Sequence, residues 1–241
     1  MPSVSNISVG ASYAGNYATK ARHEMNASIM RLSSGNRTLM GGDAGGGSVA
    51  ATILSRSKSH AVGARNAEDG ISAALTAEAS LNEMAVVATR LRELGIQYDN
   101  ASFIAAADKA AMDAEATLLF DQLAAIIAET KFNTVSLLGT AAKTFTIGIS
   151  ADTGGTNVTL KTGAAIEADL ADMTKAGCAD TTADLVLADV AESLGNVAAG
   201  IASLKARQAV SYAMAANLEA AAARISDTDF AAETANLTKH S

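Results

Sequence analysis

The stretch from Leu187 to Ile225 limits the fold more than any other part of the chain. Positions three or four residues apart along it are apolar, with two exceptions, Gln208 and Ser211. Their average spacing of about 3.5 residues keeps them on one face of a slightly underwound helix, as in a coiled coil. Such a helix extends roughly 60 Å, at 1.5 Å per residue. It needs partners along its whole length, so we expect a bundle of long helices. The stripe is Leu187, Val190, Leu194, Val197, Ile201, Leu204, Gln208, Ser211, Ala215, Leu218, Ala222 and Ile225.

Composition supports a mainly α fold. Hydrophobic residues make up 49% of the 241 residues, yet aromatic residues make up only 4% and there is no Trp. Small apolar side chains let helices approach closely, which suits a bundle better than a globule packed around large rings. The single proline, Pro2, leaves the rest of the chain free to form long helices. We therefore predict an elongated bundle of coiled-coil-like helices.

Charge and apolar patterning exclude several functions. The net charge is −7 and no basic run is present, so phosphate-directed nucleic-acid binding is not expected. No uninterrupted apolar run spans a bilayer, and the first residues lack the basic flank and apolar core of a cleaved secretory signal. The lone Cys178 cannot form an internal disulfide. Nucleic acid and membrane are thus not expected as partners.

The pattern along the chain predicts six elements. A stripe rich in Ala between Val4 and Leu32 predicts an N-terminal helix, and the glycine-rich stretch 31–48 predicts a flexible connector in which Asp43 caps the next helix. Helices are predicted at about 48–98, 103–129 and 184–226, and a further helix begins at Phe230. Alternation in 143–160 around Asp152-Thr-Gly-Gly155 predicts a β-hairpin. We expect loop with a short helix over 163–184.

Catalytic and metal chemistry finds little support in the sequence. His23-Glu24 is half of a zinc-protease motif, but the position of the second His is Ala27. His60 and His240 have no Cys or carboxylate at ligand spacing, and no nucleophile–base arrangement is visible. We expect no enzyme activity, no cofactor and no metal.

Four stretches resemble bacterial flagellin, in the order in which that family carries them. They are Arg31-Leu-Ser-Ser-Gly35 with Arg37 and Asp43; Arg65-Asn-Ala-Glu-Asp-Gly-Ile-Ser72 with Leu81-Asn-Glu83 and Arg90-Leu-Arg-Glu-Leu94; Lys131-Phe-Asn-Thr-Val135 with Leu137-Leu138; and Arg224-Ile-Ser-Asp-Thr-Asp-Phe-Ala231 with Glu233-Thr-Ala-Asn-Leu237. Each motif is weak alone, but four in register over nearly the whole chain are highly specific.

The resemblance implies a division into domains. Residues 1–42 would be the N-terminal axial helix of the inner tube with its connector, and residues 43–142 and 183–226 the helical core domain. Residues 143–182 would be a short variable insert with the hairpin, and 227–241 the start of a C-terminal axial segment. The family normally continues past Leu237 with an amphipathic helix, so the resemblance also implies a truncated chain or a natural short form.

The resemblance further implies a structural subunit of the flagellar filament that self-assembles through helix–helix contacts. Other flagellin subunits, an export chaperone, the filament cap and the Toll-like flagellin receptor are the implied partners. The implied location is the extracellular flagellum, reached by type III export without a cleaved signal peptide. The hook–filament junction protein, or a secreted helical binding module or receptor ligand, is the alternative function.

The matching motifs also imply site residues. Arg90, Leu94 and Glu115 fall on the surface that flagellins use for filament and receptor contacts, although Thr89 departs from the Gln common there. Ion pairs on an exposed helix face are the simpler interpretation of these charges. Val4, Ile7, Met25 and Leu32 fall on the axial coiled-coil stripe.

Two expectations about packing follow. The helices at 48–98, 103–129 and 184–226 should pack as one bundle with the hairpin at its distal end. The partner of residues 4–32 should be missing from this chain. Residues 1 to about 40 should therefore be mobile, and the chain should be monomeric.

Overall fold

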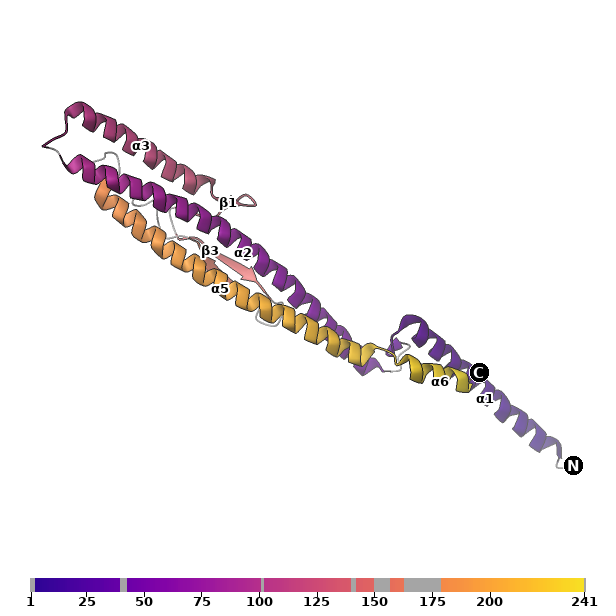
Figure 1. The fold of residues 1–241 in the computed structure, drawn as a ribbon. Helices are drawn as coiled ribbons and strands as arrows, with labels where there is room; N and C mark the ends of the chain where they lie inside the picture. The colour runs from indigo at the N-terminus through magenta and orange to yellow at the C-terminus, as the bar shows by residue number, and fades with distance from the viewer. Residues whose placement is uncertain are drawn as a thin grey trace. The chain divides into compact units, whose positions relative to one another are not determined.

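The computed structural model describes residues 3–39, 43–100, 102–139, 142–149, 157–162 and 179–240, without the side chains of 3–7 and 179–180. It divides into two compact units, unit 1 (Met1–Lys58 and Met214–Ser241) and unit 2 (Ser59–Ala213). The elements are α1 (Ser3–Ser34), α2 (Ala44–Asp99), α3 (Ala106–Glu129), β1 (Lys131–Phe132), β2 (Val135–Ser136), β3 (Thr144–Gly148), β4 (Asn157–Lys161), α5 (Ala179–Ser226) and α6 (Phe230–His240) (Figure 1). The prediction of a mainly α fold with a small β-hairpin is confirmed.

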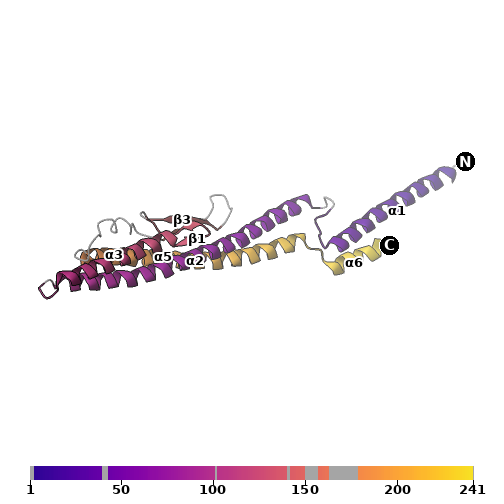
Figure 2. The same cartoon turned by 90° about the horizontal axis from the view of Figure 1, so that it is seen from above.

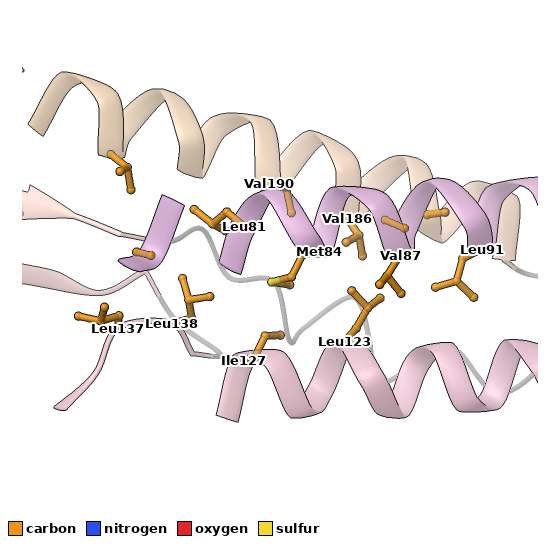
Figure 3. Close-up of a cluster of buried hydrophobic side chains, with 14 of the residues drawn as sticks. Leu81, Met84, Val87, Leu91, Leu123, Ile127, Leu137, Leu138, Val186 and Val190 are labelled. Atoms are coloured by element: carbon orange, nitrogen blue, oxygen red, sulfur yellow. The ribbon is translucent and has the colours of Figure 1, made fainter. Parts of the chain in front are cut away.

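The core of unit 2 lies where α2, α3 and α5 run side by side. Leu81, Met84 and Leu91 of α2 are fully buried in one cluster with Leu123 and Ile127 of α3, toward which Met84 points (Figure 3). Val186 and Val190 of α5 close the other side of this cluster. Leu137 and Leu138, which follow β2, cover its end. Alanine and valine supply half of the buried side chains of this cluster, which lets the three helices pack closely.

The predicted stripes account for this core. Every described position of the α5 stripe is buried or half-buried, Gln208 and Ser211 included. The sequence of the second long helix also predicts a stripe, and all its positions are buried except Ile71, which is half-buried. The stripe is Ala67, Ile71, Ala74, Ala77, Leu81, Met84, Ala88, Leu91 and Gly95. For α3 the sequence predicts an apolar side of Leu118, Leu119, Leu123, Ile126 and Ile127. This prediction is wrong only at Leu118, which is 69% exposed, because the other four positions are buried or half-buried.

The β3–β4 hairpin forms as predicted and pairs Phe145 with Leu160 and Ile147 with Val158. Its position at the distal end of the bundle is wrong, because it lies along α2 and α5 (Figures 1 and 2). A Cβ at Gly63 would stand 1.6 Å from the carbonyl oxygen of Ile149.

Two further helical glycines make room for the hairpin. A Cβ at Gly70 would meet the side chain of Ile147 at 2.3 Å, and one at Gly200 would meet that of Leu160 at 2.5 Å. From the sequence, Gly63 and Gly70 should each weaken the helix by about 1 kcal/mol relative to Ala, so we expect tertiary packing to compensate for them. The close approach of the hairpin to both glycines is that packing.

A second, smaller hairpin was not expected from the sequence. β1 and β2 pair antiparallel through Lys131–Ser136 and Phe132–Val135. Asn133 (φ 46°) and Thr134 (φ 69°) both lie in the left-handed region, which is the requirement of a two-residue type I′ turn. Asn tolerates this conformation, but a β-branched Thr there is strained.

The start of α2 shows that the glycine connector is shorter than predicted. The side chain of Asp43 accepts a hydrogen bond from the backbone N–H of Gly46 at 2.7 Å, so the predicted helix cap is confirmed. Because the cap lies at Asp43, Gly45, Gly46 and Gly47 belong to the first turn of α2 and not to the connector. Residues 40–42, 150–156 and 163–178, with the predicted hairpin turn, the predicted short helix and Cys178, lie outside the described residues.

In unit 1, α1 packs against α6. The expectation that residues 4–32 have no partner in this chain is therefore wrong for the second half of α1. From Ser8 to Lys20 every residue of α1 is exposed, whereas Ser28 is buried and Met25 and Leu32 are half-buried. Polar contacts explain why apolar patterning did not reveal this pair: the residue that α6 buries is Glu233.

By length and composition, one helical stretch among the described residues could cross a membrane, contrary to the sequence expectation. It is Thr181–Ser226, with a mean hydropathy of 1.4 in its most apolar window, a third of which is buried. The expectation failed because it required an uninterrupted apolar run, whereas alanines spread between few charges raise the average. A helix that supplies a protein core passes the same test, and Val186, Val190, Val197 and Leu204 of this stretch lie in the core of unit 2.

Candidate assembly and recognition surface

Arg90 and Glu115, predicted on one surface, lie in direct contact in unit 2. The guanidinium of Arg90 on α2 donates from Nε (3.0 Å) and Nη2 (2.7 Å) to Oε1 of Glu115 on α3. It also donates from Nη1 to Glu93, one turn further along α2, at 3.2 Å. Hydrogen bonds to Glu115 and then Glu93 raise the pKa of Arg90. The three side chains are about half exposed, so water screens these pairs and they add little to stability.

Leu94, the third residue assigned to this surface, is 1% exposed. It lies one turn from Arg90 on α2 but faces inward, so the structure does not bring it to the surface with Arg90 and Glu115. Thr89 is exposed, and its hydroxyl donates back to the carbonyl oxygen of Ala85.

Sequence patterning missed further contacts around this surface. The amine of Lys109 lies 4.9 Å from the centre of the Tyr98 ring, a cation–π geometry that joins α3 to α2. Arg92 pairs with Asp184 of α5 at 2.7 Å. Both contacts join residues of different helices, so no spacing rule within one helix could reveal them.

The two halves of α1, along which the predicted axial stripe runs, differ in burial. The side chains of Val4 and Ile7 are not among those described. Met25 and Leu32 are half-buried and lie on the part of α1 that packs against α6. In the first half of α1, Val9, Tyr13 and Tyr17 are 50%, 62% and 70% exposed. Their spacing of four places them along one face of the helix, which is apolar and open to solvent.

Polar contacts hold α6 on α1. Glu233 is 8% exposed and accepts a hydrogen bond from Arg31 at 3.4 Å. A hydrogen bond from Ser28, followed by the charge of Arg31, lowers the pKa of Glu233, although burial opposes this shift. About two turns further along α6, Nδ1 of His240 lies 3.1 Å from Glu24, a pair that is ionic only when the imidazole is protonated. The α1–α6 pair is thus antiparallel.

Two connectors meet beside this pair. The backbone N–H of Arg37 donates to the carbonyl oxygen of Ser226 (2.7 Å), and that of Thr228 donates to Gly35 (2.9 Å). Asn36 and Asp227 form the bridge between them. We call the paired segments 35–37 and 226–228 the connector clasp. It ties the end of α1 to the end of α5 through main-chain bonds, for which side-chain patterning gives no signal.

Metal-binding geometry is not found within the described parts of the chain. No group of three or more His, Cys, Asp or Glu side chains is placed to hold an ion there. Glu24, half of the protease-like motif, instead lies 3.8 Å from Nζ of Lys20 and 3.1 Å from Nδ1 of His240.

Comparison with known proteins gives the family. The family model described as "Bacterial flagellin N-terminal helical region" matches residues 6–143. Flagellin A of Vibrio anguillarum is 39% identical over 134 residues, which are 55% of this chain and 35% of the relative. Flagellin C of Vibrio cholerae serotype O1 is 35% identical over 150 residues, 62% of this chain and 40% of the relative. The matched part thus spans little more than a third of these relatives.

A solved structure, the crystal structure of Bacillus cereus flagellin, matches with a TM-score of 0.45 and 24% identity. The match covers 64% of this chain and 88% of that one. The family match from residue 6 to residue 143 includes the Arg31–Asp43, Arg65–Leu94 and Lys131–Leu138 motifs. On that match, this chain is a member of the bacterial flagellin family.

Proposed function

We propose that this chain is a structural subunit of the bacterial flagellar filament. The observation that carries the proposal is the family match over residues 6–143. The exposed apolar face of α1, formed by Val9, Tyr13 and Tyr17, supports it, because such a face gains free energy when another subunit covers it. The contacts between subunits must be heterologous, since closed two-fold contacts cannot build an open helical tube.

The domain division belongs to this proposal. Residues 1–42 and 227–241 act as axial segments, residues 43–142 and 183–226 as the helical core, and 143–182 as the short outer insert. The pairing of α1 with α6 supports the axial assignment, because it joins the two segments within one chain. Other flagellin subunits are the main partners, the export chaperone and the cap act during delivery, and no enzymatic step is needed. The subunit acts outside the cell, in the flagellum, after export without cleavage of a signal peptide.

Electron microscopy tests the proposal. The gene product, expressed in a Vibrio strain that lacks its own flagellins, should form filaments and restore swimming. The matched control is a chain carrying Tyr13→Asp and Tyr17→Asp, which should be exported but should not polymerise, because it places two charges in the apolar face. A wild-type chain that is secreted but persists as a monomer would contradict the filament role. It would favour the junction protein or the secreted binding module.

Receptor recognition is a finer part of the proposal. Arg90 of α2 and Glu115 of α3 form an exposed ion pair, so both side chains are accessible for direct contact with a receptor. Arg90→Ala and Glu115→Ala should each weaken signalling through the Toll-like flagellin receptor. Both should leave the circular-dichroism spectrum intact, since water screens an exposed pair and it adds little to stability. Failure of the wild-type chain to activate the receptor would refute this part alone.

A further inference from the structure

One side chain of unit 1, Arg37, reaches two helix ends at once. Its Nε and Nη2 donate to the carbonyl oxygen of Ile225 at 3.3 and 2.9 Å. Its Nη2 also lies 2.9 Å from Oδ2 of Asp43. Ile225 belongs to the last turn of α5, where carbonyl groups have no partner within the helix. Arg37 supplies that partner.

The second contact of Arg37 involves the cap of α2. Oδ1 of Asp43 accepts the hydrogen bond from the N–H of Gly46, and Oδ2 accepts that from Arg37. The bond from Gly46, and then that from Arg37, lowers the pKa of Asp43. The two charges also lie where helix dipoles favour them, the carboxylate at the N-terminus of α2 and the guanidinium at the C-terminus of α5.

These contacts lie beside the connector clasp. Arg37 is itself a member of the clasp, and its backbone N–H is bonded to Ser226. The end of α1, the start of α2 and the end of α5 therefore meet at one residue. Only a planar guanidinium can donate in two directions from a fixed fork, so a lysine in this position would satisfy one acceptor at a time.

We propose that Arg37 is a positioning residue for subunit assembly: it fixes the direction in which the α1–α6 pair leaves the ends of α2 and α5. The assembly role rests on the proposed filament function, whereas the fixing of direction does not. Arg37 and Asp43 are each partly exposed, so their partners can be hydrated when the contact is lost. Loss of Arg37 therefore frees the direction of the pair without unfolding the helices. The pair itself persists, because Arg31–Glu233 and Glu24–His240 do not involve Arg37.

Spin-label distances in the full-length chain test this inference. Labels at Arg22 on α1 and Val49 on α2, two exposed positions in unit 1, are introduced with Cys178 replaced by Ser. Wild type should give one narrow distance distribution. Arg37→Ala should broaden it at least twofold, with unchanged helix content. Arg92→Ala is the matched control, because it removes an exposed ion pair of the same kind in unit 2, and it should leave the distribution narrow.

Two conservative variants separate the contacts. Asp43→Asn keeps a side-chain cap for α2 but removes the charge, so the Gly46 amide should exchange at most about threefold faster while the distribution broadens partly. Arg37→Lys should restore part of the wild-type width. Should Arg37→Ala fail to fold, these two variants decide the question. Wild-type widths in all the folded variants would show that Arg37 does not fix the pair.

The assembly role has its own readout. When wild type forms filaments, Arg37→Ala should reduce their yield at least tenfold and Arg37→Lys should restore part of it. Filament formation by Arg37→Ala at the wild-type level, despite a broadened distribution, would refute the assembly role. Failure of wild type to form filaments would instead refute the proposed function, and the distance result in the monomer would stand.

Discussion

The substitution Gly63→Ala adds one methyl group to α2 and tests how closely the β3–β4 hairpin packs against this helix. In Gly63→Ala the new Cβ would lie 1.6 Å from the carbonyl oxygen and 2.4 Å from the carbonyl carbon of Ile149. Both atoms are backbone, so no side-chain rotation relieves the contact. The hairpin end must move by about 1.5–2 Å to restore van der Waals distance. Ile149 and Val158, which are 3% and 7% exposed beside Ala67 and Leu204, would be pulled outward.

The magnitude follows from three opposing effects. Replacing glycine by alanine inside a helix gains about 1 kcal/mol. Partial exposure of Ile149 costs about 1.5–2 kcal/mol, and residual overpacking costs about 1–3 kcal/mol. The clash therefore outweighs the propensity gain, and we expect a net loss of about 1.5–4 kcal/mol. For a unit of this size, that lowers the Tm by about 3–16 °C.

Gly195→Ala is the matched control, because a Cβ at Gly195 of α5 meets nothing within 4 Å. It should stabilise unit 2 by about 0.5–1 kcal/mol. Urea unfolding followed by circular dichroism gives both free energies on one scale. Equal stabilisation by the two substitutions would refute the close approach of Ile149 to Gly63. Restored stability in a Gly63→Ala chain from which the hairpin 143–162 has been replaced by a short linker would confirm it.

Three further perturbations probe other parts of the chain. Leu204→Asp should unfold unit 2, because Leu204 is fully buried and the new charge would be unpaired. Leu194→Asp should destabilise unit 2 less, because Leu194 is half-buried. Thermal unfolding that is unchanged in both variants would contradict the predicted stripe. The pKa of Glu233 is lowered below 4.5 in the folded chain, so its ionised form stabilises the α1–α6 pair above pH 4.5. This stabilisation is lost as the pH falls through the folded pKa. The amide protection factors of α6 should therefore drop with acid in wild type but not in Glu233→Gln. Hydrogen exchange across α1 should be fast from Ser8 to Lys20 and slower around Ser28, which is buried against α6; strong protection of residues 10–20 in the monomer would show that the first half of α1 has a partner.

The helices of unit 2 could be predicted from the sequence because their apolar residues recur at a helical spacing. Ile201, Leu204 and the other stripe positions of α5 repeat at a spacing that fits one buried face, and burial of that face decides the packing. The packing of the β3–β4 hairpin against α2 could be predicted only in part. Gly63 and Gly70 could be recognised as costly in a helix, but nothing in their spacing shows that Ile149 and Ile147 approach them.

The contacts of unit 1 escaped prediction because they are polar or main-chain. Glu233 interrupts the apolar pattern of α6, although it is the residue that this helix buries. The connector clasp uses N–H and C=O groups that every residue carries. Among the site residues, Arg90 and Glu115 could be placed on one surface by resemblance, but their direct contact could not. The inward orientation of Leu94 is consistent with its position three residues after the buried Leu91, on the same side of α2.

The buried carboxylate of Glu233 also determines how α1 and α6 are aligned along their axes. Ala21 and Ala27 lie half-buried on the α1 side of the pair, and alanines offer little resistance to a shift by one helical turn, about 5.4 Å. A slip in one direction would move Glu233 from Ser28 to Glu24, where two carboxylates repel. A slip in the other direction would place it against Leu32, which has no side-chain donor, and would leave a buried charge unsatisfied. Ser28 and Arg31 thus act as a stop, and a subunit whose axial segments could otherwise lock one turn out of place is held at a single length.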